Sequence, residues 1–172
     1  NSVAIKLENG DNSFVFTGDA EHASESAMCN NGIDLECDVL VPGHHGSATA
    51  TSWEFLQKTV PEYAVISCGK DNKYGHPDKD TMDKLESMEI KVYRTDKQGT
   101  ITVVSDGNTL KWSENPCNDY TPGDDNDTGT KVSGSAGTKQ TASSQSQDNT
   151  NDMVWISATG SKYHRINNCG RM

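Results

Sequence analysis

Two adjacent histidines, His44 and His45, follow a short apolar run at residues 39–41, and Pro42 and Gly43 stand between the run and the pair. The apolar run predicts a buried strand that the Pro-Gly pair terminates. The imidazoles would then lie at the carboxyl end of a strand, the edge where open α/β sheets place their chemistry. Neighbouring histidines on a turn point in different directions, so one can bind a metal while the other faces a substrate. The same residues also fit a polar turn without a chemical role.

Two other predicted strands end in residues that can do chemistry. The strand at residues 13–17 is followed by Asp19, and the strand at residues 63–68 leads into a loop that holds Lys70 and His76. Three successive strands thus place a carboxylate or an imidazole at their carboxyl ends, which predicts one common site. A carboxylate has two oxygens and can span two metal ions. Asp19 also fits a simpler role as the N-cap of the helix predicted directly after it.

The rest of the first two thirds of the chain alternates strands and helices, a pattern typical of α/β folds. The first strand, at residues 2–7, puts Val3, Ile5 and Leu7 on one face and joins the second strand through a hairpin turn rich in Asn and Gly. Helices are predicted at residues 20–28, 53–58 and 78–88, and further strands at residues 90–95, 100–105 and 109–112. These elements predict an α/β sandwich half.

The three motifs, read in order as FTGDA, VPGHHGS and GKDNKYGHP, resemble those of the metallo-β-lactamase superfamily. The branch they resemble is the soluble hydrolase domain related to the DNA-uptake protein ComEC. The resemblance covers residues 1–113 and implies that residues 1–116 form the C-terminal half of an αββα sandwich. It also implies a hydrolase whose nucleophile is a hydroxide activated by two zinc ions.

The resemblance assigns roles to individual residues. Asp19 matches the metal-bridging aspartate, and His45 matches a zinc ligand. His44 would then lie near the substrate, as a proton donor or a phosphate contact. His76 matches a histidine that faces the same cleft, and Lys70 could stabilise charge on an attacked phosphate.

The first metal motif of the superfamily, H-x-H-x-D-H, is absent from the chain. Zinc sites take three or four protein ligands, and this chain offers two. The resemblance therefore implies that the N-terminal half of the same domain completes the site. We expect the isolated chain to be inactive or weakly active.

The balance of charged residues limits which ligands the chain can bind. The chain has 15 Lys and Arg against 25 Asp and Glu, a formal net charge of −10. This balance argues against binding nucleic acid by charge alone, although it does not exclude a nuclease whose metal ions bind the phosphate. A small ester, a phosphodiester or a cell-wall polymer fits the motifs as substrate, and the acidic charge disfavours DNA. No apolar run approaches the length of a membrane span.

Composition changes sharply after residue 116. Residues 117–152 are almost wholly polar and predict a disordered linker, because such a segment buries too little apolar area to order itself. Residues 153–172 begin with a strand-like run and resemble the start of a small C-terminal module of secreted Gram-positive proteins. His164 and Cys169 would be half of a small zinc site in that module. Linker and module favour an extracellular or cell-surface location, and an unstructured tail is the alternative.

Three functional classes stay open at this level. The first is a metal-dependent hydrolase, and the second is a non-catalytic cell-surface binding module that keeps the fold. The third is a DNA-processing subunit of an uptake machine. An upstream half without metal ligands would favour the second class, and a salt-dependent affinity for DNA would favour the third.

Overall fold

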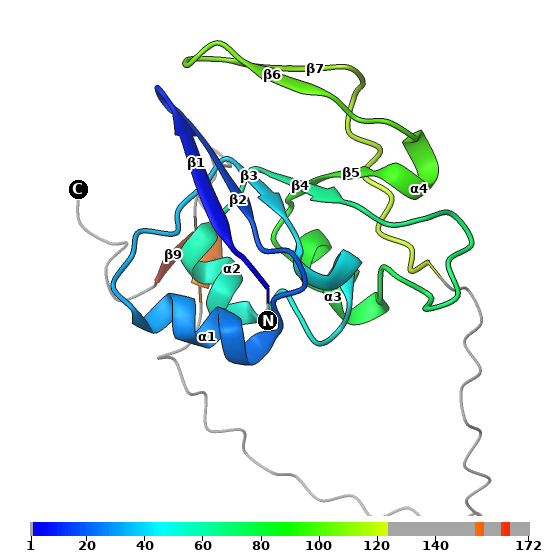
Figure 1. The fold of residues 1–172 in the computed structure, drawn as a ribbon, viewed down its shortest axis with the longest axis horizontal. Helices are drawn as coiled ribbons and strands as arrows, with labels where there is room; N and C mark the ends of the chain where they lie inside the picture. The colour runs from blue at the N-terminus through cyan, green and yellow to red at the C-terminus, as the bar shows by residue number, and fades with distance from the viewer. Residues whose placement is uncertain (1, 124–153, 157–162, 166–172) are drawn as a thin grey trace, which may run out of the picture. The chain divides into compact units, whose positions relative to one another are not determined.

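The computed structural model describes residues 2–123, 154–156 and 163–165 (Figure 1). The chain divides into two units, Asn1–Asp125 and Asn126–Met172. In the second unit, β8 (Val154–Ile156) and β9 (Tyr163–Arg165) form an antiparallel pair, so a strand is present where the sequence predicts one. Cys169, the side chain of His164 and residues 124–152 of the predicted linker lie outside the described residues.

The first unit is mixed α/β and contains a five-stranded sheet in the order β1-β2-β3-β4-β5. Its strands are β1 (Ile5–Asn9), β2 (Asn12–Phe16), β3 (Val39–Val41), β4 (Tyr63–Ile66) and β5 (Lys91–Arg94). β1 runs antiparallel to β2, whereas β2 to β5 run parallel to one another. The carboxyl ends of β2, β3 and β4 therefore lie at one edge of the sheet, as the sequence predicts.

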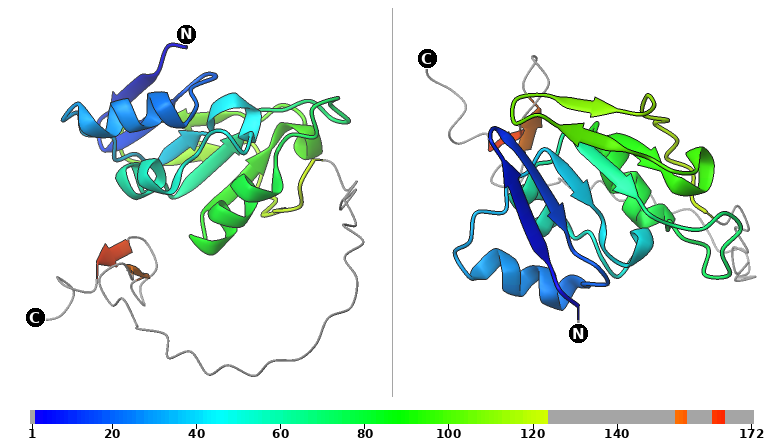
Figure 2. Two further views of the ribbon diagram at one scale, coloured as in Figure 1. Left: turned by 90° about the horizontal axis from the view of Figure 1, so that it is seen from below. Right: turned by 45° about the horizontal axis from the view of Figure 1, so that its top comes forward.

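A helix follows each of the first three parallel strands. These helices are α1 (His22–Asn30), α2 (Trp53–Thr59) and α3 (Lys79–Ser87), and a short α4 (Thr95–Gln98) follows β5. The parallel strands succeed one another in chain order, and crossover connections share one hand, so α1, α2 and α3 must lie on the same face of the sheet. Figures 1 and 2 show this arrangement. Leu56, Met82 and Leu85 are fully buried on that face. No helix in the described part of the chain is long and apolar enough to cross a membrane.

Helix α1 begins later than the sequence predicts. Its N-cap position is Glu21 and not Asp19, so the N-cap role for Asp19 is wrong. The start of the helix depends on a distant contact, because the backbone N–H of His22 donates to the Thr49 carbonyl at 2.9 Å. Inside the helix, the buried carboxylate of Glu25 accepts from two backbone N–H groups next to α2, the nearer at 2.5 Å.

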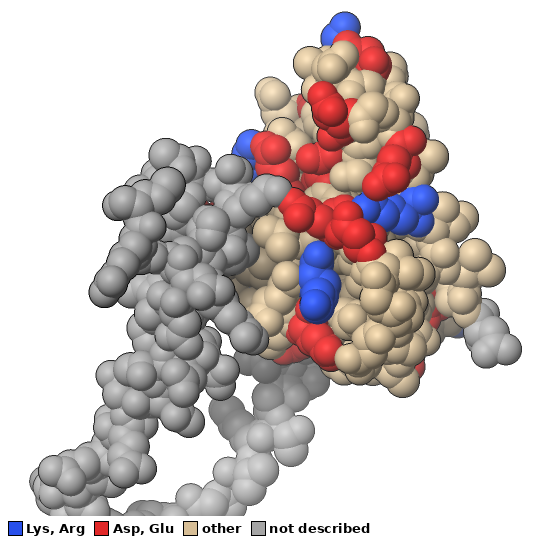
Figure 3. Space-filling model, turned by 90° about the vertical axis from the view of Figure 1, so that its left-hand side faces the viewer, with Lys and Arg blue, Asp and Glu red and all other residues tan. Residues whose placement is uncertain are grey.

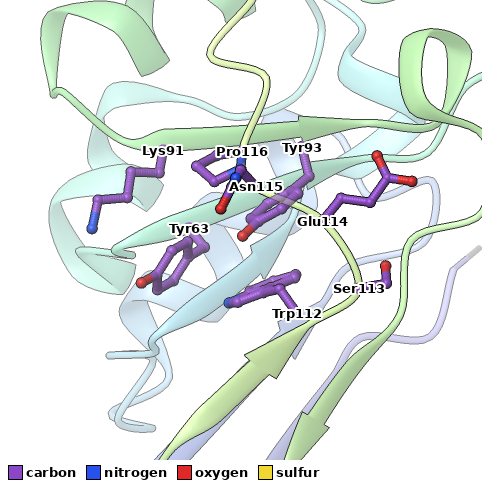
Figure 4. A pocket seen from close by; sticks show the side chains of 8 residues that line it. All are labelled: Tyr63, Lys91, Tyr93, Trp112, Ser113, Glu114, Asn115 and Pro116. Carbon is purple, nitrogen blue, oxygen red and sulfur yellow. The ribbon is translucent and has the colours of Figure 1, made fainter.

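The antiparallel hairpin of β6 (Val103–Ser105) and β7 (Leu110–Trp112) covers the face opposite the helices over β4 and β5, where aromatic stacking holds it. Its turn also reaches the turn between β1 and β2, where the Asp11 N–H donates to the Gly107 carbonyl at 2.6 Å. The ring of Trp112 lies 4.0 Å from that of Tyr93 and 5.1 Å from that of Tyr63, between centroids (Figure 4). A cavity of about 500 Å³ opens beside these rings. The Trp112 Nε1 is buried there and has no hydrogen-bond partner among the described residues.

Over the rest of β1 and β2 the same face is only partly covered, because Phe14 is buried whereas Ile5, Leu7 and Phe16 are exposed. Ile5 pairs with Phe16 and Leu7 with Phe14 across the antiparallel ladder, so the four side chains share one face. The parallel register places Phe14 level with Val39 and Val39 level with Tyr63, which identifies it as the face that carries the aromatic stack. Ile5 is 55% exposed, Leu7 52% and Phe16 38%. Contiguous exposed apolar residues on a sheet mark a contact surface.

The folded unit continues past the boundary predicted at residue 116. The chain after β7 returns along β5, where the N–H of Asn118 donates to the Val92 carbonyl at 3.1 Å and the hydroxyl of Tyr120 donates to the Ile90 carbonyl at 2.9 Å. Further on, the N–H of Gly123 donates to the Pro77 carbonyl at 2.8 Å. Residues 117–123 are therefore part of the α/β unit and not of a linker.

Arg94 anchors this returning segment. Its guanidinium forms two hydrogen bonds with the carboxylate of Asp96, at 2.6 and 3.0 Å, and also donates to the carbonyls of Asp119 and Thr121. The side chains of Arg94 and Asp96 are 0% and 8% exposed. Burial alone would raise the pKa of Asp96, but the hydrogen bonds and charge of Arg94 outweigh burial and hold that pKa below its usual 3.8.

We predict that Arg94→Met destabilises the fold by about 3–5 kcal/mol, because it leaves the Asp96 carboxylate buried without its partner. Urea unfolding at pH 7 measures this change. Lys79→Met is the matched control, since it removes an exposed ion pair with Asp83, and exposed pairs contribute little to stability. The lowered pKa of Asp96 means that the pair stabilises the fold above pH 3.8. The difference between wild type and Arg94→Met should therefore shrink as the pH falls below 3.8, and an unchanged difference would contradict this assignment.

Candidate functional site

The turn after β3 brings two left-handed histidines into one short segment. His44 has φ 50° and His45 has φ 60°, within a 3₁₀ turn at Gly43–Gly46. Left-handed backbone costs a residue with a Cβ roughly 1–2 kcal/mol, so the turn must be held by its neighbours. Backbone hydrogen bonds hold it on both sides. The His44 N–H donates to the Gly18 carbonyl at 2.9 Å, and the Gly46 carbonyl accepts from the Asp78 N–H at 2.9 Å.

Glycines on either side of the histidines allow the neighbouring loops to approach closely. A Cβ on Gly43 would lie 2.5 Å from the carbonyl oxygen of Ala20, in the loop that follows β2. A Cβ on Gly46 would lie 2.8 Å from the Cβ of Pro77, in the loop that follows β4, and Gly46 also has φ +84°. In the P-G-H-H-G pattern, the histidines therefore supply the imidazoles and the glycines allow the loops to pack closely.

His45 and Asp19 face each other at this edge. The His45 Nδ1 lies 2.7 Å from the Ser67 carbonyl oxygen. A carbonyl can only accept, so Nδ1 carries the proton and the neutral imidazole keeps its lone pair on Nε2. That Nε2 lies 3.9 Å from Oδ1 of Asp19, and the His45 and Asp19 side chains are 55% and 69% exposed. A histidine oriented by a backbone carbonyl, with its other nitrogen open beside a carboxylate, is the arrangement that metal-binding histidines adopt.

His44 and His76 form a second group next to the first. Their rings meet edge to face, with centroids 5.6 Å apart. The His44 Nδ1 lies 3.1 Å from Oε1 of Glu21, and the His76 Nδ1 lies 3.4 Å from Oδ2 of Asp78. Neither contact has hydrogen-bond alignment, and both Nδ1 atoms lack such a partner within the described residues. A carboxylate thus lies beside each imidazole.

The structure therefore brings four of the five predicted site residues together. Asp19, His44, His45 and His76 meet at one edge of the sheet, as the strand order requires. Lys70 is exposed and lies in the same loop as His76. It does not line the cavity of about 320 Å³ beside the histidines, which is bounded by His45, Ser67, Cys68, Gly69, Asn72, Tyr74 and His76.

Sequence reasoning missed three contributors. Two of them are carboxylates: Glu21 lies beside His44, and Asp78 lies beside His76. Each stands two residues after a predicted site residue, Asp19 or His76, and this proximity in the sequence was a usable signal. The third is the Ser67 carbonyl, which sets the tautomer of His45. A backbone carbonyl leaves no trace in the residue types, and only the fold identifies it.

The residues present do not make a complete metal site. Within the described part of the chain, no group of three or more His, Cys, Asp or Glu side chains is placed to hold an ion. Asp19 and His45 have suitable donor atoms, but zinc takes three or four protein ligands.

Cys68 lies in the cavity beside His45, and its thiol is free. Burial, together with the negative charge of Asp96, raises the pKa of this thiol to about 12. The thiolate is the form that attacks electrophiles and binds metals. Cys68 is therefore neither a nucleophile nor a ready metal ligand at neutral pH.

We predict that Gly46→Ala destabilises the fold by at least about 1 kcal/mol more than Gly32→Ala. Gly32 has a similar φ of +80° but no atom within 4 Å of an added Cβ, so the pair separates steric overlap from backbone strain. Thermal unfolding gives the stabilities. Imidazole NMR signals of His45 and His76 should shift only in Gly46→Ala, and equal destabilisation by the two variants would disprove the close-packing argument.

We also predict that Cys68 resists iodoacetamide in the folded protein at pH 8, although it borders a cavity. Its pKa of about 12 leaves almost no thiolate at that pH. Peptide mass spectrometry reports the labelling of each thiol. The same protein in urea is the control, because an unperturbed thiol with a pKa of about 8.5 reacts readily. Rapid labelling of Cys68 in the folded state would contradict the prediction.

Comparison with known proteins finds relatives among curated sequences. ComE operon protein 3 of Bacillus subtilis is 41% identical over 100 residues, which are 58% of this chain and 13% of that protein. Competence protein ComA of Neisseria gonorrhoeae is 37% identical over 101 residues, 58% of this chain and 15% of its own length. Recombination protein 2 of Haemophilus influenzae is 35% identical over 102 residues, 59% of this chain and 13% of its own length.

No protein-family model and no solved structure matches the chain. The chain thus matches a small part, at most 15% of the length, of these three curated relatives. Over more than half of its own length, it is homologous to proteins named for competence and recombination.

Proposed function

We propose that this chain is part of a metal-dependent phosphodiesterase, in which Asp19 and His45 are two of the metal ligands. The observation that carries the proposal is the orientation of His45. Its Nδ1 is committed to the Ser67 carbonyl at 2.7 Å, and its Nε2 faces the Asp19 carboxylate at 3.9 Å. A histidine with a structural role alone would not need an open nitrogen beside an exposed carboxylate.

The remaining ligands come, in this proposal, from another part of a longer protein packed on the partly covered face of β1 and β2. Ile5, Leu7 and Phe16 are exposed there, and an apolar sheet face of this kind packs well against a second sheet. The curated relatives are several times longer than this chain, so they have room for such a partner sheet. The proposed assembly is a metallo-β-lactamase sandwich of which this chain is one half.

The metal we propose is zinc, as a pair of ions that would supply a hydroxide nucleophile when bound. The roles of this chain's own residues follow from their positions. Asp19 and His45 present exposed donor atoms at the edge of the sheet where β2 and β3 end. His44, next to His45, is the candidate for the group that donates a proton to a leaving oxygen. His76 can contact a phosphate of the substrate. Lys70, in the same loop, can stabilise the negative charge of that substrate.

Competence and recombination in the names of the relatives favour DNA as the substrate and DNA uptake as the setting. The charge of this chain limits how DNA would bind. Asp and Glu dominate the charged side chains on the face in Figure 3, in line with the formal net charge of −10. A general electrostatic attraction is therefore absent, and recognition must rest on the metal and on local contacts.

In the protein expressed from its complete gene, Asp19→Asn and His45→Gln should each lower the cleavage of bis-p-nitrophenyl phosphate and of single-stranded DNA by at least about 100-fold. The reason is that even residues one shell outside a metal contribute 10- to 100-fold. A chelator should abolish cleavage, and added Zn²⁺ or Mn²⁺ should restore it.

His22→Gln is the matched control, because His22 is exposed on α1 three residues from Asp19 and should leave the rate unchanged. Full activity of Asp19→Asn and His45→Gln would disprove the proposed ligands. Binding of DNA or of a cell-wall polymer without any hydrolysis by the wild type would instead support the non-catalytic binding module.

A further inference from the structure

The loop between β4 and α3 is built around one side chain, that of Asn72. Its Nδ2 donates to the carbonyls of Gly69 and His76, at 2.9 and 2.6 Å. Its Oδ1 accepts from the N–H groups of Tyr74 and His76, at 3.2 and 3.0 Å. Four hydrogen bonds from one amide use its full capacity and fix the backbone on both sides of Tyr74. The position of Tyr74 is therefore set by the fold.

Tyr74 presents its ring to solvent from this fixed position. Its exposed fraction is 66%, among the highest of the large hydrophobic side chains in the described residues. Its ring lies almost parallel to the His76 imidazole, at 17° with centroids 5.9 Å apart, and it borders the cavity that His45 also lines. An exposed aromatic ring beside a candidate catalytic site offers a flat stacking surface to a ligand.

Two lysines lie in the same loop as this ring in an otherwise acidic protein. The ammonium of Lys73 lies over the face of the Tyr74 ring, 4.8 Å from its centroid, and Lys70 is exposed. Neither lysine forms an ion pair with another described residue, whereas Lys6, Lys79, Lys84, Lys91 and Lys97 all do. Lys70 and Lys73 balance the two acidic side chains of the loop, Asp71 and Asp78. The loop therefore has cationic groups available for an anionic ligand.

We propose that Tyr74 stacks against a base of single-stranded nucleic acid, with Lys70 and Lys73 on the adjoining phosphates. Aromatic rings combined with lysines are the means by which proteins hold unpaired strands without reading their sequence. A neutral sugar would not need the lysines, and a small phosphate ester would not need the ring. A duplex keeps its bases stacked on one another and leaves Tyr74 without a partner.

This inference rests on the proposed function, because the stacked base would place the next phosphate toward His45 and Asp19. Tyr74 is then a positioning residue and takes no part in bond cleavage. Its contribution can be measured without hydrolysis, which separates the two proposals. Binding to Tyr74 requires no metal, whereas cleavage requires Asp19 and His45.

The test is fluorescence anisotropy of the full chain in EDTA with a labelled 12-nucleotide thymidine strand, the same strand with abasic sites, and a 12-base-pair duplex. Tyr74→Ala should weaken binding of the thymidine strand about 5- to 150-fold, the range for loss of one stacked base. Tyr74→Trp should bind at least as tightly as wild type. The abasic strand and the duplex should not respond to Tyr74→Ala.

Two further variants complete the design. Lys70→Ala and Lys73→Ala should weaken the thymidine and abasic strands alike, and each should reduce the slope of log affinity against log salt by about 0.7. Trp53→Ala is the matched control, because Trp53 is another exposed aromatic residue, 49% accessible, on α2 and outside the cavity.

Unchanged binding of the thymidine strand by Tyr74→Ala, an equal loss with the abasic strand, or no binding by the wild type would each overturn the inference. If Asp19→Asn loses cleavage and Tyr74→Ala binds the strand normally, the proposed function holds and the inference about Tyr74 fails. If Asp19→Asn cleaves normally and Tyr74→Ala binds weakly, the inference about Tyr74 holds and the proposed function fails.

Discussion

The site depends on how closely three loops can approach one another at the edge of the sheet. The turn that carries His44 and His45 is packed between the loop after β2 and the loop after β4, and glycines stand at both contacts. Because a side chain at Gly43 or Gly46 would push a neighbouring loop away, those two contacts set the spacing between Asp19, the histidine pair and His76. The left-handed backbone of both histidines is maintained by the same packing, so local strain is offset by contacts that the strand order makes possible.

The strand order also determines which face of the sheet the helices of this chain leave uncovered. Four parallel strands in chain order place every crossover helix on one face, and a single hairpin shields part of the other through Trp112. A chain with helices on both faces would need its strand order to reverse at some point. The exposed surface at Ile5, Leu7 and Phe16 is thus a consequence of topology.

Sequence patterns predicted what depends on neighbours along the chain. Apolar runs that end in Pro or Gly located the strands, and the parallel arrangement then placed Asp19, His45 and His76 together. Features that depend on distant partners were missed. The start of α1 is fixed by the Thr49 carbonyl, which removes Asp19 from the N-cap position. Residues 117–123 look like linker because they are polar, but they form hydrogen bonds with distant residues, and the partners of Asn118, Asp119 and Thr121 lie on β5.

In the proposed hydrolase, metal binding and docking of the second sheet are linked. Two donors on this chain bind an ion weakly, and a full set forms only when both halves are together. An ion that contacts both halves must then stabilise their association by as much as the association strengthens its binding. The fixed orientation of His45 adds to this coupling, because the imidazole loses little further freedom when the rest of the site arrives. On this proposal, the second sheet docks on the exposed apolar face in the same step in which the metal site at the edge of the sheet is completed.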